Sequence, residues 1–141
     1  MPPDLRSTVL LRSEDSGGHL SVVENVVPAR SAGPPLHSHG FDETFYVLEG
    51  ELVVRVGDAL LARTAGQLAF APRGVAHALA NRRDAPVRYL LVCTPAGFER
   101  HFARTAAQAN GIEPPPWALQ PVPEVVALGP PIPQEVLDLL E

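Results

Sequence analysis

Two histidines and two acids lie within eight residues of the chain, in the segment LHSHGFDE at residues 36–43. Imidazole nitrogens and carboxylate oxygens together suit Fe, Mn, Co, Ni, Cu or Zn, and such a site needs no thiolate. Because side chains alternate along a strand, His37 and His39 point to the same side if this segment is extended. Glu43 joins them only if the chain stays extended or bulges at the intervening glycine. The segment is therefore a candidate metal site that still needs a ligand from elsewhere.

His77 is the candidate for that distant ligand. It follows the segment GQLAFAPRGVA at residues 66–76, which has the pattern of a strand, a Pro-x-Gly turn and a returning strand. A His-x-His pair alone is weak support, because surface loops often carry one. The alternative at this point is a polar loop and an unrelated histidine.

The spacing of these residues resembles the two signature motifs of the cupin superfamily. The first motif is G-x5-H-x-H-x3,4-E-x6-G, and the second is G-x5-P-x-G-x2-H-x3-N. The matching positions are His37, His39, Glu43, Gly50, Gly66, Pro72, Gly74, His77 and Asn81. The opening glycine of the first motif falls on Ser31, and the nearest glycine is Gly33. The motifs cover residues 33–81, and the flanking strands extend the resemblance to about residues 7–94.

This resemblance implies an all-β fold, namely a single cupin barrel (a double-stranded β-helix or jelly roll) with one divalent transition metal inside. The implied protein ligands are His37, His39, Glu43 and His77. A metal that prefers octahedral coordination would keep two positions open for substrate, water or O₂. Glu43 is also the candidate catalytic base. The ligand set does not fix the identity of the metal.

The predicted strands support a barrel independently of the motifs. Short β-branched or aromatic segments alternate with turn signals, which is typical of an antiparallel sandwich or barrel. These segments lie at residues 8–11, 19–27, 43–48, 51–56, 68–71, 77–81 and 87–93. We expect the barrel to take residues 1–96, with its core at 19–94.

Residues 97–141 have a different pattern. Phe98, Phe102, Ala106 and Ala109 lie on one helical face, which predicts a helix over 97–109 that stops at residues 110–111. Eight prolines between residues 114 and 133 predict extended geometry outside any sheet interior. A last short helix is expected at 134–140. We expect this extension to pack on the barrel or on a partner subunit.

The composition limits the functional classes. The 141 residues fit one domain, and the formal charge of −5 without a basic cluster argues against nucleic acid or anionic membrane as a partner. All eleven basic residues are arginine, which excludes a lysine nucleophile. Cys93 is the only cysteine, and the N-terminus lacks the apolar segment of a signal peptide, so we expect a cytoplasmic protein. The bias toward Arg, Ala, Pro and Gly is typical of GC-rich bacterial genomes.

Several other residues carry weaker predictions. Core packing is expected for most of Phe41, Phe45, Phe70 and Tyr89, with the alternative that they line an apolar pocket. Solvent exposure or local turn roles are expected for His19, Asp42, Arg73 and Asn81, and Cys93 is expected to be a buried, inert thiol. His101 is expected to be solvated, with the alternative that it lies over the barrel mouth as an acid or base.

Three functions compete for this site. The first is an oxygenase acting on an enolic or aromatic small molecule, because residues 37–98 resemble quercetin dioxygenase-like cupins. The second is a metal-assisted isomerase or polyketide-type cyclase that does not use O₂, and the third is a non-catalytic binding cupin. The resemblance also implies a homodimer, for which the valine pairs at residues 22–23 and 26–27 are candidate contacts.

Overall fold

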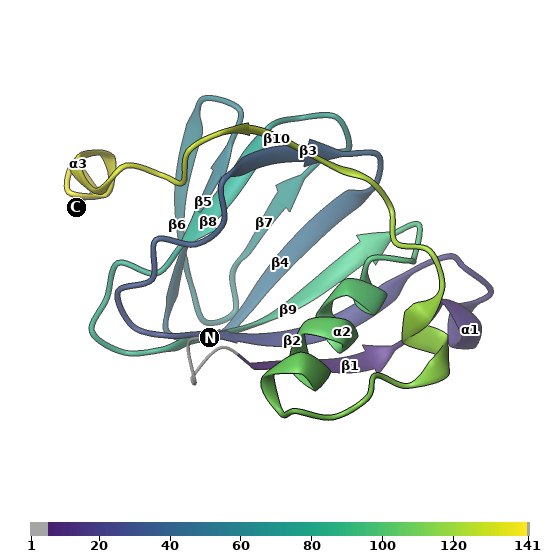
Figure 1. The fold of residues 1–141 in the computed structure, drawn as a ribbon. Helices are drawn as coiled ribbons and strands as arrows, with labels where there is room; N and C mark the ends of the chain where they lie inside the picture. The colour runs from purple at the N-terminus through teal and green to yellow at the C-terminus, as the bar shows by residue number, and fades with distance from the viewer. Residues whose placement is uncertain (1–5, 141) are drawn as a thin grey trace.

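Two antiparallel five-stranded sheets face each other in this protein, whose computed structural model describes residues 6–140 (Figure 1). The first sheet contains, in spatial order, β1 (Arg6–Leu11), β2 (Ser21–Val27), β9 (Val87–Thr94), β4 (Asp42–Glu49) and β7 (Leu68–Ala71). The second contains β10 (Val125–Gly129), β3 (Leu36–His39), β8 (His77–Ala80), β5 (Glu51–Val56) and β6 (Ala59–Thr64). The predicted all-β barrel with a C-terminal helix is confirmed.

Strand alternation builds the core between the sheets. Along β9, Val87, Tyr89, Leu91 and Cys93 are buried, and the residues between them are partly exposed. Phe45 of β4 is buried as predicted, with 1% of its surface exposed. The burial predicted for the thiol of the only cysteine is confirmed as well.

The prediction that Phe70 belongs to the core is wrong, because 48% of its surface is exposed. Its neighbours Ala69 and Ala71 face inward, where they pair in register with Phe45 and Glu43 of β4. Phe70 therefore has the opposite parity and points to the outer surface. Four-residue strands of this kind carry an aromatic residue on either face, so residue type alone does not assign the face.

Four elements were not predicted: α1 (Ser13–Ser16), β6, the 3₁₀ turn η1 (Pro116–Leu119) and β10. β10 lies among the prolines of the C-terminal segment and pairs with β3 at the edge of its sheet. An edge strand between prolines agrees with the expectation that this segment avoids a sheet interior. β2 has β1 on one side and β9 on the other, so its valine pairs have no free edge for pairing with a partner. A homodimer stays a prediction that would need another surface.

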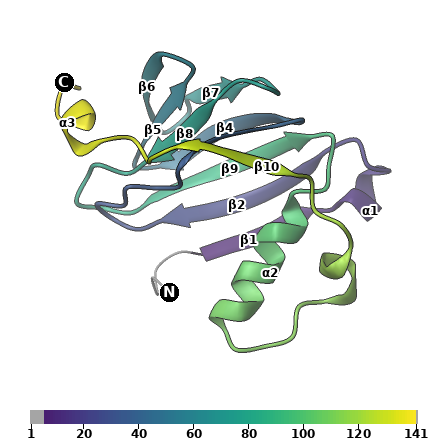
Figure 2. The ribbon, with the colours of Figure 1, turned by 45° about the horizontal axis from the view of Figure 1, so that its top comes forward.

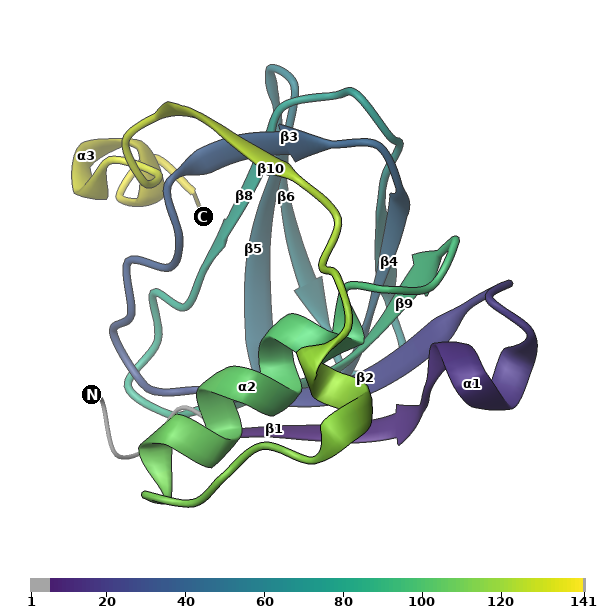
Figure 3. The same cartoon turned by 45° about the vertical axis from the view of Figure 1, so that its right-hand side comes forward.

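The helix α2 (Glu99–Ala109) crosses the open side of the barrel next to β1 (Figures 2 and 3). Phe98 and Phe102 pack against the core between the sheets. The buried carboxylate of Glu99 accepts hydrogen bonds from the backbone N–H of Ser13 (2.7 Å) and of Gly97 (2.6 Å). These bonds fix the start of α2 against the β1–β2 connection.

The chain after α2 returns to the second sheet, the one that contains β5 and β8. After the 3₁₀ turn η1 (Pro116–Leu119) and β10, the chain ends in α3 (Gln134–Leu137), the predicted short helix. Ile132 and Leu137 form an apolar cluster with Val53 and neighbouring alanines on the outer face of β5 and β8. None of the helices in residues 6–140 is long and apolar enough to span a membrane.

Gly33 makes a close backbone contact that requires a glycine at this position. Its φ is +74°, and a Cβ there would lie 1.8 Å from the carbonyl oxygen of Leu79. Ser31 instead bridges Asn81, whose backbone N–H donates to the Ser31 carbonyl at 3.0 Å.

We expect Gly33→Ala to lower the free energy of unfolding by more than about 3 kcal/mol, because the strained φ adds to a backbone clash that no rotamer relieves. Gly66→Ala is the matched control, since its φ is +84° and a Cβ there would meet nothing within 4 Å. The control should lose only about 1 kcal/mol. Denaturant unfolding measures both, and equal losses would contradict the close approach at Gly33.

Candidate metal centre

Three strands bring the predicted ligands together at one end of the barrel interior. β3 carries His37 and His39, β8 carries His77 in register with His37, and β4 of the facing sheet carries Glu43. One ligand atom from each of the four residues lies within 4.8 Å of all the others. His39, Glu43 and His77 are buried, and His37 is partly exposed.

Backbone carbonyls fix the protonation of the three imidazole rings. Nδ1 lies 2.7 Å from the carbonyl oxygen of Pro35 in His37, 2.9 Å from that of Phe41 in His39, and 3.0 Å from that of Val75 in His77. A carbonyl only accepts, so each Nδ1 carries the proton and donates it. Each Nε2 is then left as a lone pair for a metal, which is the tautomer that metal-binding histidines use.

The lone pairs and the carboxylate meet at one place. Nε2 of His39 and Nε2 of His77 are 3.1 Å apart, and Oε1 of Glu43 lies 3.3 Å from the latter and in direct contact with the former. Three acceptor atoms so close together repel one another unless a cation or a proton lies between them. Burying them unpaired would cost several kcal/mol, about 1–3 for each group. The donor set therefore fits a divalent transition metal held by nitrogen and oxygen.

Aromatic packing holds one of the rings in place. The ring of Phe41 stacks on His39 with centroids 3.6 Å apart and an interplanar angle of 5°. Phe98, which precedes α2, packs in turn on Phe41 at 5.1 Å. The helix on the open side of the barrel thus supports the orientation of a candidate ligand through a chain of rings.

Burial and hydrogen bonding act in opposite directions on the pKa values of the cluster. Burial raises the pKa of Glu43, but the contacts of its carboxylate with Nε2 of His39 and His77 outweigh it and lower that pKa to about 2 when a proton lies between nitrogen and oxygen. Burial lowers the pKa of His77, but its bonds to Glu43 and Val75 outweigh it and raise that pKa. Burial lowers the pKa of His37 and so favours its neutral, ligating form. Glu43 is therefore ionised at neutral pH and requires a cationic partner.

In the metal-free protein, a proton on His77 takes the place of that cation. The folded-state pKa of Glu43 is below its ordinary value of 4.5, so its contribution to stability is present above pH 4.5 and is lost as the pH falls toward 2. The pKa of His77 is above its ordinary value of 6.5, so its contribution is present below pH 6.5 and is lost as the pH rises through the raised pKa.

We expect the melting temperature of the metal-free protein to be highest between about pH 4.5 and 6.5, the window in which both contributions are present. Glu43→Gln should flatten this profile, because it removes the charge that both shifts depend on. Thermal unfolding with a chelator present measures it. Glu49→Gln, at the exposed end of the same strand, is the control and should keep the wild-type profile. A wild-type profile in Glu43→Gln would contradict the ion pair.

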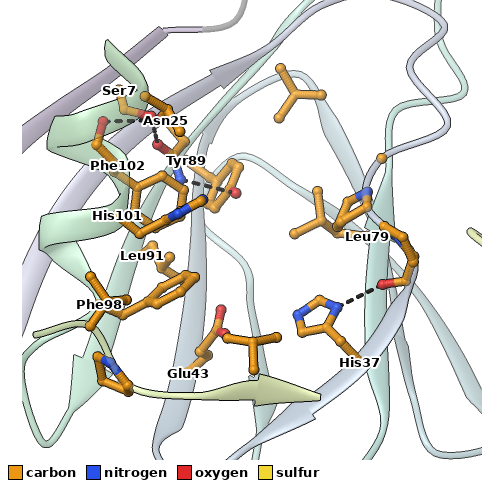
Figure 4. A pocket seen from close by; sticks show the side chains of 18 of the residues that line it. Ser7, Asn25, His37, Glu43, Leu79, Tyr89, Leu91, Phe98, His101 and Phe102 are labelled. Carbon is orange, nitrogen blue, oxygen red and sulfur yellow. Dashed lines mark hydrogen bonds between the residues drawn. The ribbon is translucent and has the colours of Figure 1, made fainter. Parts of the chain in front are cut away.

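A cavity of about 710 Å³ opens beside the cluster (Figure 4). His37 and Glu43 line it, so the cluster faces the cavity rather than being sealed in the core. Its walls are largely apolar and come from both sheets, from α2 and from residues 122–127. Figure 4 shows the Glu43 carboxylate pointing into this space, with Phe98 and Phe102 along one wall.

His101 lies on the cavity wall, stacked on Phe98 with ring centroids 5.0 Å apart. It is also exposed to solvent, as the main prediction from the sequence has it. The alternative, an acid or base over the barrel mouth, stays a prediction. Partial desolvation of the ring, which lies against Phe98, together with the charge of Arg104 lowers its pKa.

The remaining predicted residues have structural roles. Asp42 accepts a hydrogen bond from the backbone N–H of Arg73 at 2.8 Å and pairs with the exposed guanidinium of that residue. Asn81 is buried, and its Oδ1 accepts the backbone N–H of Arg83 at 3.0 Å, which confirms a role in a turn. His19 is exposed.

Sequence analysis missed Asn25, a polar residue of the cavity wall. Asn25 lies in the valine-rich segment SVVENVV and is 2% exposed. Asn25 alternates with Val23 and Val27, so it faces the same side of the strand as these valines, and a polar residue in that position could have indicated a cavity. The sequence alone does not show which side of the strand faces inward, because the neighbouring strands are unknown.

Comparison with known families decides the classification. A family model described as the cupin domain matches residues 22–93. The chain belongs to the cupin family. Comparison with curated proteins finds no match.

Solved structures resemble this cupin over about two thirds of its length. A protein from Thermus thermophilus shares 29% identity, with 67% of this chain and 87% of the other covered and a TM-score of 0.59. A Thermotoga maritima protein described as a predicted oxalate decarboxylase shares 25% identity, with coverage of 64% and 80% and a TM-score of 0.60. The polyketide cyclase RemF from Streptomyces resistomycificus, at 24% identity, 64% and 65% coverage and a TM-score of 0.57, shows a similar fold alone.

Proposed function

We propose that this cupin is a metal-dependent oxygenase acting on an enolic or aromatic small molecule. The supporting observation is that the His37, His39, Glu43 and His77 cluster faces a large and mostly apolar cavity. Cavities of about 300–1,000 Å³ are typical of small-molecule sites. Four protein ligands on an octahedral metal leave two positions, which suffices for a substrate oxygen and O₂.

The walls of the cavity favour a flat, largely apolar substrate. Leu79, Leu91, Phe98 and Phe102 line it, and none of them can solvate a small dianion. Oxalate would fill little of this volume, so the description of the Thermotoga relative is a weak guide to the substrate here. An aromatic or enolic compound would bury its ring against these side chains and direct its oxygen to the cluster.

A divalent metal at this site would act as a Lewis acid that stabilises an enolate or phenolate, and a redox-active metal would also pass electrons to O₂. Glu43 holds its place through His39 and His77, and in that position its low pKa makes it a weak base. It would accept a substrate proton only after leaving these partners, which raises its basicity. Phe98, beside the cluster, would keep water away from the reacting carbon.

The test measures O₂ uptake by protein loaded with Fe²⁺, Mn²⁺, Co²⁺, Ni²⁺ or Cu²⁺, with a panel of phenols and enolic diketones. We expect uptake with at least one of these metals and none with Zn²⁺. We expect Glu43→Gln to lose about a hundredfold or more of the activity, because it removes a ligand and the candidate base. Glu49→Gln, a carboxylate on the exposed end of the same strand, should retain wild-type activity.

Other outcomes would favour the competing functions. Product formed without O₂, with Zn²⁺ as effective as the other metals, would contradict the oxygenase and favour an isomerase or cyclase. Ligand binding without turnover for any metal would favour a binding cupin.

A further inference from the structure

A row of three polar side chains crosses the apolar cavity wall at a distance from the metal cluster. Ser7 of β1 pairs in register with Asn25 of β2, and Asn25 pairs with Tyr89 of β9, so the three side chains lie next to one another. All three line the cavity, and Asn25 and Tyr89 are 2% and 3% exposed (Figure 4). Polar groups buried this deeply in an apolar wall are costly unless their hydrogen bonds are made.

The hydrogen bonds in this row run in one direction. The hydroxyl of Ser7 donates to Oδ1 of Asn25 at 2.6 Å, and Nδ2 of Asn25 donates to the hydroxyl oxygen of Tyr89 at 3.2 Å. In this arrangement the amide oxygen of Asn25 accepts from Ser7, and its amide nitrogen faces Tyr89. Tyr89 thus receives a hydrogen bond, and no acceptor for its own O–H is present among residues 6–140. Figure 4 shows this hydroxyl pointing into the cavity.

We infer that Tyr89 donates a hydrogen bond to an acceptor oxygen at the end of the substrate remote from the metal, and that Ser7 and Asn25 position it for this. The inference deepens the proposed function and rests on it for the other end of the substrate. Tyr89 keeps its proton throughout the physiological range, because burial and then the charge of Glu43 raise its pKa. It therefore acts as a donor and not as a base.

The position of the row sets the shape of the substrate. Tyr89 pairs with Val47, which lies four residues after Glu43 on β4. At about 3.4 Å per residue, the backbone of Glu43 and that of Val47 are roughly 14 Å apart along the strand. The side chains and the metal fill part of this distance, and the substrate has to span the rest. The site is thus suited to an elongated compound with a phenol or enol at one end and a carbonyl, ether or hydroxyl oxygen at the other.

Calorimetric titration of the Zn²⁺-loaded protein with two matched probes tests this. The probes are 4-hydroxyacetophenone and 4-isopropylphenol, which have nearly the same shape but differ in the carbonyl oxygen. We expect the wild type to bind the ketone about tenfold more tightly, since the second probe leaves the Tyr89 donor unpaired. Tyr89→Phe should abolish this preference. Tyr46→Phe, which alters the other tyrosine on the exposed face of β4, should leave it unchanged.

Ser7 gives a second test that spares the donor itself. Ser7→Ala removes the donor to the Asn25 amide oxygen. This loss favours the reversed amide, whose oxygen accepts from Tyr89, so the preference should fall several-fold, and Ser7→Thr should restore it. Equal binding of both probes by the wild type, or an unchanged preference in folded Tyr89→Phe, would overturn the inference and leave the proposed function intact. Failure of both probes to bind the wild type would overturn the inference and the proposed function together.

Discussion

Replacing His77 with alanine is expected to lower the affinity of the protein for Zn²⁺ by more than about a hundredfold. Removing a residue that only hydrogen-bonds to a metal ligand already costs about 10–100-fold in affinity, and removing a ligand itself should cost more. His77 contributes a buried Nε2 that faces both His39 and Glu43. Without it, the metal would keep three protein ligands and the carboxylate would lose one of its two hydrogen-bond partners. Competition with a chromogenic chelator measures the affinity.

His101→Ala is the matched control, because this histidine lines the same cavity but lies outside the cluster. Its affinity for Zn²⁺ should be that of the wild type. Far-UV circular dichroism of each variant separates loss of binding from loss of fold. Similar affinity in the folded His77→Ala variant and the wild type would contradict the ligand assignment.

The second large effect concerns the core. Phe45→Ala should reduce the free energy of unfolding by about 3–5 kcal/mol, the usual cost of removing a buried aromatic ring. Phe45 is 1% exposed, and its ring lies 5.8 Å from that of Tyr89 between the two sheets. Urea denaturation measures the difference.

Phe70→Ala removes the same ring from the neighbouring strand, where 48% of the residue is exposed. We expect a loss of at most about 1 kcal/mol. The pair compares two phenylalanines that the sequence does not distinguish. Losses of similar size would show that β7 has the opposite register to the one described.

This pair shows where prediction from sequence reaches its limit. The fold was predictable because histidines, glycines and turn residues at fixed spacing mark the strands and the turns between them. The face of each strand was not, since it depends on register with partners far along the chain. Phe70 follows the register of β7 with β4, which places Ala69 and Ala71 inside.

The candidate site also has a part that the sequence predicts and a part that it does not. The juxtaposition of His37, His39, Glu43 and His77 follows from motif spacing, and the structure brings all four together. The cavity could not be predicted, because part of its wall comes from α2 and from β10. β10 is an edge strand within a proline-rich segment, where no strand was expected. β6 was missed for a local reason: its sequence, ALLART, contains few β-branched residues.

X-ray absorption at the Zn edge, on wild-type protein reconstituted with Zn²⁺ and dialysed, tests the central claim most directly. We predict one tightly held ion per chain, with scattering from three imidazole rings and at least one further oxygen ligand. An ion bound through fewer than two imidazoles or through the sulfur of Cys93, or no stoichiometric binding, would contradict the metal centre.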